Sequence, residues 1–196
     1  MTAEAFEREL AQHCSPAMAG IKPANIVTFL SEVGEERNSL YHLIHIYSRR
    51  FWSQDLRFQI LCECPRRILL MVYRSSLLEA QVNQPSVKRL LEKEGYRLGR
   101  ISEMVEQLGE RIKQAGQCQF PHEIGVFLGY PLEDVKGFIE NKGKNFLYSG
   151  YWKVYSDVER AKSYCRHWEQ VRDRLLQVMD TGKTIYDMFY LHQKSA

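Results

Sequence analysis

The chain has 196 residues, of which 44% are hydrophobic, enough to bury the core of one ordinary domain, so we expect a single domain over residues 1–196. Its 27 lysines and arginines against 24 aspartates and glutamates leave a formal net charge of +3, which is too balanced for a protein that wraps nucleic acid or coats an acidic membrane. No export signal and no run of about 18 apolar residues stand out, so we expect a cytoplasmic protein, away from membranes, whose five cysteines are reduced thiols.

The N-terminal segment combines a short helix with a proline-containing loop. Residues 2–13 have the apolar spacing of an amphipathic helix that ends near Cys14. Ser15 and Pro16 are expected to open a turn, because serine caps helices and proline fits a first helical position. After this loop, residues 25–30 predict a strand.

The middle of the chain predicts a helix followed by a β-hairpin. Residues 38–52 carry apolar side chains at the spacing of one helical stripe. Residues 56–64 alternate between apolar and polar, which predicts a half-buried strand with Cys62 and Cys64 together on its apolar face. The apolar run over residues 67–73 predicts a strand covered on both faces and paired antiparallel with the first.

Most of the remaining chain is expected to be helical. Residues 146–155 are rich in aromatic side chains and predict a fourth strand. Residues 156–159 match a capping box that begins a long helix. Helices are expected over residues 75–95 with a break at Pro85, over 102–115, over 121–142 as a helical hairpin, from the capping box to 182, and from Thr184. These elements predict an α+β fold, a small and mainly antiparallel sheet packed with about six to eight helices.

The hairpin over residues 121–142 also fits the helix-turn-helix template of DNA-binding proteins, with Gly129 at its turn. A DNA-reading helix needs basic and amide side chains, whereas the positions that we expect to be exposed are Glu133, Asp134, Lys136 and Glu140. Residues 120–143 contain two lysines and four carboxylates, a net charge of −2 that repels phosphates. We therefore do not expect nucleic acid as a partner.

His122 and Glu123 are the most distinctive polar pair, and they follow Pro121 at the start of the hairpin. Glu123 could simply stabilise the start of the helix, because a helix N-terminus favours a carboxylate. The functional alternative is that the two side chains act as a general acid–base pair or as metal ligands. The metal alternative is weak, since the second histidine of the zinc-protease pattern is missing.

His13 and Cys14 form a second polar cluster before the predicted turn. A thiol that faces the free N–H groups of a turn has a lowered pKa and can act as a nucleophile, a redox centre or a ligand for a soft metal. The alternative is a small buried cysteine that packs in the core. The sequence leaves both readings open.

Three segments carry a likeness to other chains: HCSPAMAGIKPAN at 13–25, FPHEIGVFLGYPLEDVKGFI at 120–139 and YSGYWKVYSD at 148–157. Together they resemble a family of small bacterial proteins catalogued only as a domain of unknown function. The resemblance implies no established activity, cofactor or catalytic residue. It does imply iron or redox physiology, through an association of the family with anaerobic bacteria and with gene neighbourhoods for ferrous iron uptake and flavodoxin. The polar positions that match the family are His13, Cys14, Lys22, Asn25, His122, Glu123, Lys153 and Tyr155.

Our leading hypothesis is a ligand-, metal- or partner-binding protein in iron or redox physiology. In it Cys14 and His122 supply soft or nitrogen ligands, and Glu123 orients or deprotonates the ligand. Lys22 and Lys153 are expected to bind an anionic group of the ligand. Further candidates for ligand binding are His13, Asn25 and Tyr155. The hypothesis requires these segments to converge in space.

Two alternatives belong to other functional classes. A thiol-dependent enzyme would use Cys14 as its nucleophile and His122 as the base. A regulator or adaptor would dock a protein partner on the hairpin, with Val126, Phe127 and Tyr130 as exposed apolar anchors.

Overall fold

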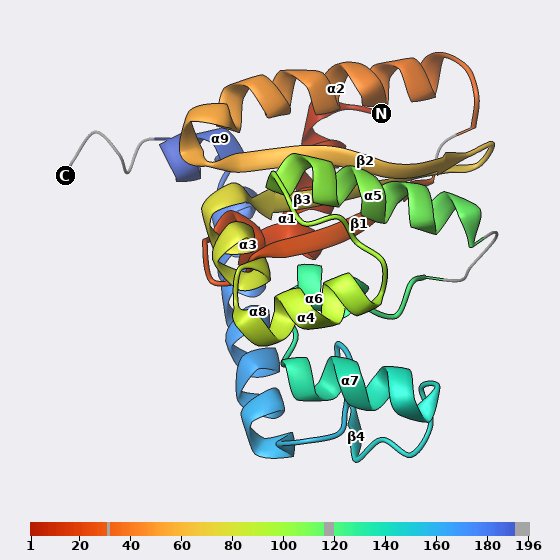
Figure 1. The fold of residues 1–196 in the computed structure, drawn as a ribbon. Coiled ribbons are helices and arrows are strands. Elements are labelled where there is room, and N and C mark those ends of the chain that lie inside the picture. Colours follow the sequence, from red (N-terminus) through yellow and green to blue (C-terminus); the bar gives the residue numbers. More distant parts are fainter. Residues whose placement is uncertain (31, 116–119, 191–196) are drawn as a thin grey trace.

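The structure is a computed structural model that describes residues 1–30, 32–115 and 120–190 (Figure 1). Its main sheet has three antiparallel strands in the order β1-β3-β2. The strands are β1 (Ala24–Leu30), β2 (Leu56–Cys64) and β3 (Arg67–Arg74). The predicted strands over 25–30, 56–64 and 67–73 are therefore confirmed, as is the α+β fold.

Helices make up most of the remaining structure and pack on both faces of the sheet (Figure 1). In chain order the described helices are α1 (Ala3–Met18), α2 (Glu35–Phe51), the short 3-10 helix η1 (Trp52–Gln54), α3 (Ser75–Val82), α4 (Pro85–Lys93), α5 (Ile101–Gln114), α6 (Ile124–Phe127), α7 (Leu132–Asn141), α8 (Val158–Asp180) and α9 (Ile185–Tyr190). The predicted break at Pro85 separates α3 from α4.

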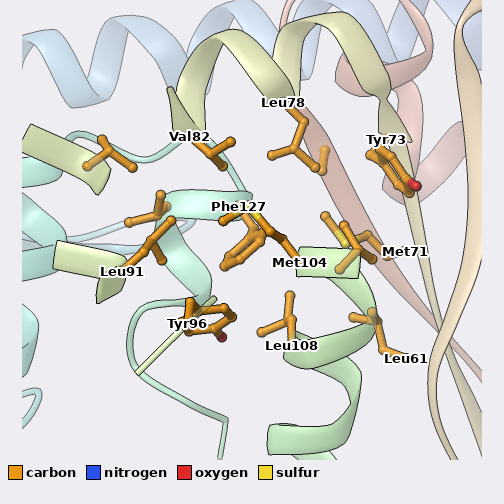
Figure 2. Packing of buried hydrophobic residues seen from close by; sticks show 14 of the residues in the cluster. Leu61, Met71, Tyr73, Leu78, Val82, Leu91, Tyr96, Met104, Leu108 and Phe127 are labelled. Atoms are coloured by element: carbon orange, nitrogen blue, oxygen red, sulfur yellow. The ribbon is translucent and has the colours of Figure 1, made fainter. Parts of the chain in front are cut away.

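The central strand β3 separates two hydrophobic clusters. Because successive side chains of a strand point to opposite faces, Leu70 packs with α1 and α2, while Met71 packs with α3, α5 and α6. Figure 2 shows the second cluster, in which Phe127 of α6 lies among side chains from several helices. Its ring centroid is 5.4 Å from that of Tyr96. The first helix of the predicted hairpin is thus part of the core.

A bulge in β2 corrects the predicted position of two cysteines. The register with β3 shifts between Ile60 and Cys62, so that Leu61 is an extra residue in the strand. Ile60 therefore packs with α1 and α2, whereas Cys62 packs on the opposite face. The prediction that Cys62 and Cys64 share the face of Ile60 was wrong, because a bulge reverses the alternation that follows it.

Helix α1 is longer than predicted and passes through Pro16 to end at Met18. Ser15 does not cap a turn, since its hydroxyl donates instead to the carbonyl of Ala11. The end of the helix is held from outside: Asn25 Oδ1 accepts from the N–H of Ala17 at 3.1 Å, and Arg74 Nε donates to the carbonyl of Ala17 at 3.0 Å. These contacts satisfy backbone groups at a helix end.

The predicted strand over 146–155 is instead a small hairpin apart from the main sheet. Its strands β4 (Tyr148–Ser149) and β5 (Lys153–Val154) pair with each other. The N–H of Gly150 donates to the carbonyl of Trp152 at 3.0 Å, so the chain turns within the predicted strand. Helix α7, this hairpin and the first turns of α8 form the end of the molecule opposite α2 (Figure 1).

The start of α8 differs by one residue from the predicted capping box. Its N-cap is Asp157, whose side chain accepts from the N–H of Arg160 at 2.9 Å. Ser156 donates its hydroxyl to Asp134 of α7 at 2.8 Å instead. The serine therefore joins two elements and does not cap the helix.

Candidate functional site

A cleft of about 860 Å³ opens between α5, the segment before α6, α7 and the β4–β5 hairpin. Among the described residues, its lining includes three basic side chains and two carboxylates, together with a larger number of aromatic and aliphatic side chains. The lining residues are Arg111, Ala115, Phe120, Pro121, His122, Glu123, Ile124, Gly125, Tyr130, Asp134, Val135, Phe138, Tyr151, Trp152 and Lys153. Three of the sequence candidates, His122, Glu123 and Lys153, therefore meet in one cavity.

Glu123 is buried and holds two other side chains. Its Oε1 accepts from Tyr96 Oη at 3.0 Å and from Arg111 Nε at 2.9 Å, and the residue is only 2% exposed. Burial raises the pKa of Tyr96, and the adjacent Glu123 carboxylate raises it further. Glu123 makes no side-chain cap to α6. Two donors already occupy Oε1 of this carboxylate, which favours a role in positioning over proton transfer.

Arg111 is a cleft residue that the sequence did not single out. Its guanidinium lies 4.8 Å from the ring centroid of Tyr96 and donates through Nε to Glu123. Neither terminal nitrogen donates a hydrogen bond within the described part of the chain. An arginine that is held at Nε can use its two terminal nitrogens to bind a carboxylate or phosphate. No local pattern distinguishes Arg111 from the other basic residues of the chain.

Asp134 was expected to be exposed on the second helix of the hairpin, but it is 1% exposed. Its carboxylate accepts from Trp152 Nε1 at 2.7 Å, from the N–H of Tyr155 at 2.8 Å, and from the N–H and hydroxyl of Ser156 at 2.9 and 2.8 Å. The prediction was wrong because residues from the β4–β5 segment cover this face of α7. Asp134 thereby fixes the position of Trp152 in the cleft wall.

Aromatic rings form one wall of the cleft, and Lys22 lies against them. Tyr130 and Trp152 stack with centroids 4.9 Å apart. Lys22 Nζ lies 4.9 Å from the ring centroid of Tyr130 and 4.7 Å from that of Trp168 on α8. Lys22 is 3% exposed, and no described residue forms an ion pair or hydrogen bond with its amine. Burial lowers the pKa of Lys22 to about 7.

Cys14 lies near Lys22 and does not line the cleft. Its side chain is fully buried in α1, among the residues that pack on β1 and β3. Burial raises the pKa of the Cys14 thiol, although the nearby Lys22 amine opposes this effect. A thiol with a raised pKa is protonated at neutral pH and is a poor nucleophile. This environment argues against the thiol-dependent enzyme.

His122 is exposed at the cleft, with its ring centroid 5.1 Å from that of Phe138. The structure thus places Cys14 in the core beside Lys22 and His122 in the cleft lining. Throughout the described ranges, no group of three or more histidine, cysteine, aspartate or glutamate side chains could hold a metal ion. Neither observation favours a metal site shared by Cys14 and His122.

The other candidates have separate positions. His13 is exposed, with Nε2 3.5 Å from a carboxylate oxygen of Glu9. The side chain of Asn25 accepts a hydrogen bond from the backbone near the end of α1. Lys153 lines the cleft, with Nζ 3.8 Å from the ring centroid of Phe146. The ring of Tyr155 packs on α7, because a Cβ added at Gly137 would lie 2.5 Å from its Cγ. Within the described chain the buried hydroxyl of Tyr155 has no hydrogen-bond partner.

The adaptor hypothesis required exposed apolar side chains on the hairpin. Val126 and Phe127 are both 0% exposed and belong to the core cluster of Figure 2. Tyr130 is partly buried and stacks on Trp152 in the cleft wall. The prediction that Val126 and Phe127 are exposed anchors was wrong, whereas an adaptor role of the hairpin stays a prediction.

Comparisons with known proteins place the chain in a family without naming an activity. No curated protein and no solved structure is detectably similar to it. Among the helices that the structure describes, none has the length and apolar character needed to cross a membrane. A family model described as a protein of unknown function, DUF3793, matches residues 10–189. Because this match covers most of the sequence, the chain belongs to the DUF3793 family.

Proposed function

We propose that the cleft binds a small organic anion with an aromatic or apolar body and at least one acidic group. The observation that carries this proposal is the hydrogen bonding of the two carboxylates and three basic side chains that the described lining contains. Glu123 and Asp134 are buried and already accept hydrogen bonds from the protein, as described above. Arg111, His122 and Lys153 are the groups left to meet a ligand.

The charge balance supports an anion over a cation. Arg111 offsets the charge of Glu123, and four donors satisfy Asp134, so the accessible groups are basic. Opposite charges attract more strongly in a partly water-excluded cavity than in bulk water. A cationic ligand would have to displace hydrogen bonds that hold the fold together.

Size and apolar lining support a ligand with a ring or hydrocarbon body. Small-molecule sites usually have volumes of about 300–1,000 Å³, with apolar walls and a few polar groups that fix orientation. The cleft of about 860 Å³ falls within this range. Tyr130, Trp152 and Phe138 supply ring surfaces on which a planar body can stack.

A fluorescent aromatic anion, anilinonaphthalene sulfonate, provides a direct test. We expect it to bind and quench tryptophan fluorescence, and Lys153→Met to weaken its affinity about tenfold, the size expected when a charge-assisted hydrogen bond is lost. Lys162→Met is the matched control, because Lys162 pairs with Glu159 on α8 and is not among the lining residues of the cleft. Equal affinities of the two variants would refute an anion site at Lys153.

We also propose, on the resemblance alone, that the protein acts in the bacterial cytoplasm, in iron or redox physiology. This proposal is tested by purifying the protein from its own host without oxygen. The purified protein is then examined by metal analysis and native mass spectrometry. A co-purifying organic acid would support the cleft as its site. A stoichiometric metal instead would favour the metal-binding form of the hypothesis.

A further inference from the structure

Lys22 is a buried base in contact with the wall of the cleft. Its side chain does not line the cleft, but its amine lies over Tyr130, which does. The same amine lies over Trp168, and Trp168 is 5.6 Å from Trp152 between ring centroids. Aromatic rings therefore lie between Lys22 and the cleft.

Among the residues that the structure describes, the titratable groups around Lys22 include no carboxylate. Cys14 faces it from α1 and Cys165 from α8, while Tyr130 and Tyr151 lie toward the cleft. Burial raises the pKa of Tyr130 to about 12 and also raises those of Cys14 and Tyr151, so these groups are neutral near pH 7. A protonated Lys22 is stabilised here mainly by the faces of two rings.

We propose that Lys22 is a proton-binding positioning residue of the cleft, which takes up a proton when an organic anion binds and stabilises that anion through the aromatic wall. This inference rests on the proposed function. A charge acts over longer distances in a protein interior than in water, because the effective dielectric constant is lower. By linkage, an anion that favours protonated Lys22 binds more tightly when Lys22 is already protonated.

His122 also lines the cleft, so a ligand could contact its imidazole directly and obscure an effect of Lys22. The experiment therefore uses His122→Gln as the reference protein. Lys22→Met removes the amine, and Lys22→Arg keeps a positive charge at every pH of interest. Far-UV circular dichroism confirms that each variant is folded.

The main measurement is calorimetric titration with anilinonaphthalene sulfonate in buffers of different ionisation enthalpy, which counts the protons taken up. If the anion raises the pKa of Lys22 by about one unit, affinity in the reference protein falls about tenfold between about pH 6 and pH 9. We expect Lys22→Met and Lys22→Arg, each in the His122→Gln background, to bind without this pH dependence. The same proton uptake without Lys22 would overturn the inference.

A second measurement needs no ligand. In a Trp52→Phe background the remaining tryptophans are Trp152 and Trp168, and both belong to the ring cluster at Lys22. Their fluorescence should titrate near pH 7 in the reference protein and not in Lys22→Met. A flat titration in the reference protein refutes coupling between Lys22 and the wall. Absence of anion binding by the wild-type protein, together with a clear titration, would instead refute the proposed function.

Discussion

Replacing Lys22 with methionine should remove a large pH dependence of stability. The pKa of the Lys22 amine is lowered from 10.5 to about 7 in the folded protein. Between these values the unfolded chain binds a proton that the folded chain does not. The free energy of unfolding therefore rises with pH in this window, and the gain is lost as pH falls through 7.

The magnitude follows from the slope of this linkage, about 1.4 kcal/mol per pH unit for one proton. From about pH 7 to pH 9 the stability of the wild-type protein should rise by about 2–3 kcal/mol. Above its ordinary pKa of 9.0 the unfolded Cys14 thiol loses a proton that the buried thiol retains, and this acts in the opposite direction. The rise should therefore level off above about pH 9.

Urea unfolding followed by circular dichroism at several pH values between about 6 and 9 measures this profile. Lys22→Met should be more stable than the wild type at the acid end, and the difference should shrink as pH rises. Lys162→Met is the control, because Lys162 is in an exposed ion pair with Glu159 and its loss should change stability by less than about 1 kcal/mol. Parallel profiles for Lys22→Met and the wild type would refute the assignment of a buried, depressed amine.

Three further predictions concern groups that the structure describes as buried. Glu123→Gln should lower the free energy of unfolding by about 2 kcal/mol in urea, less than the roughly 3–5 kcal/mol of a fully buried pair because Arg111 is partly exposed; no loss would mean that the pair is not formed. Asp134→Ala should lower it by about 3 kcal/mol, since it leaves buried donors unpaired, whereas exposed Glu133→Ala should change it by less than about 0.5 kcal/mol; similar losses would contradict the burial of Asp134. Ellman's reagent should leave Cys14 unmodified in the folded protein while the partly exposed cysteines of β2 react, and labelling of Cys14 at their rate would contradict its burial.

The elements that local patterns describe were predictable from the sequence. Helices α2 and α5 each repeat one apolar spacing, and β3 is one continuous apolar run, so their positions can be predicted without knowledge of distant residues. The failures occur where one residue breaks the spacing. The bulge at Leu61 reverses the face of Cys62, and the turn at Gly150 divides a predicted strand into two.

The candidate site was only partly predictable, because its parts are joined by long-range contacts. His122 and Lys153 were named from their chemistry and do line the cleft. Arg111 has no local signal, and the burial of Asp134 depends on a hairpin that comes later in the chain. Lys22 was named as an anion contact, but its position beside Tyr130 follows from how the loop after α1 packs on the α6–α7 connection.

Asp134 and Lys22 are both buried near the cleft wall, but within the described chain only Asp134 has hydrogen-bond partners for its charge. Asp134 has four hydrogen-bond donors, which is the usual condition for burying a charge. Lys22 has two ring faces and no anionic partner among the described residues. An apolar side chain at Lys22 would serve stability better, because a buried amine without an anion lowers it. This difference is what leads us to propose that the charge which Lys22 lacks arrives with a ligand, in the cleft lined by Tyr130.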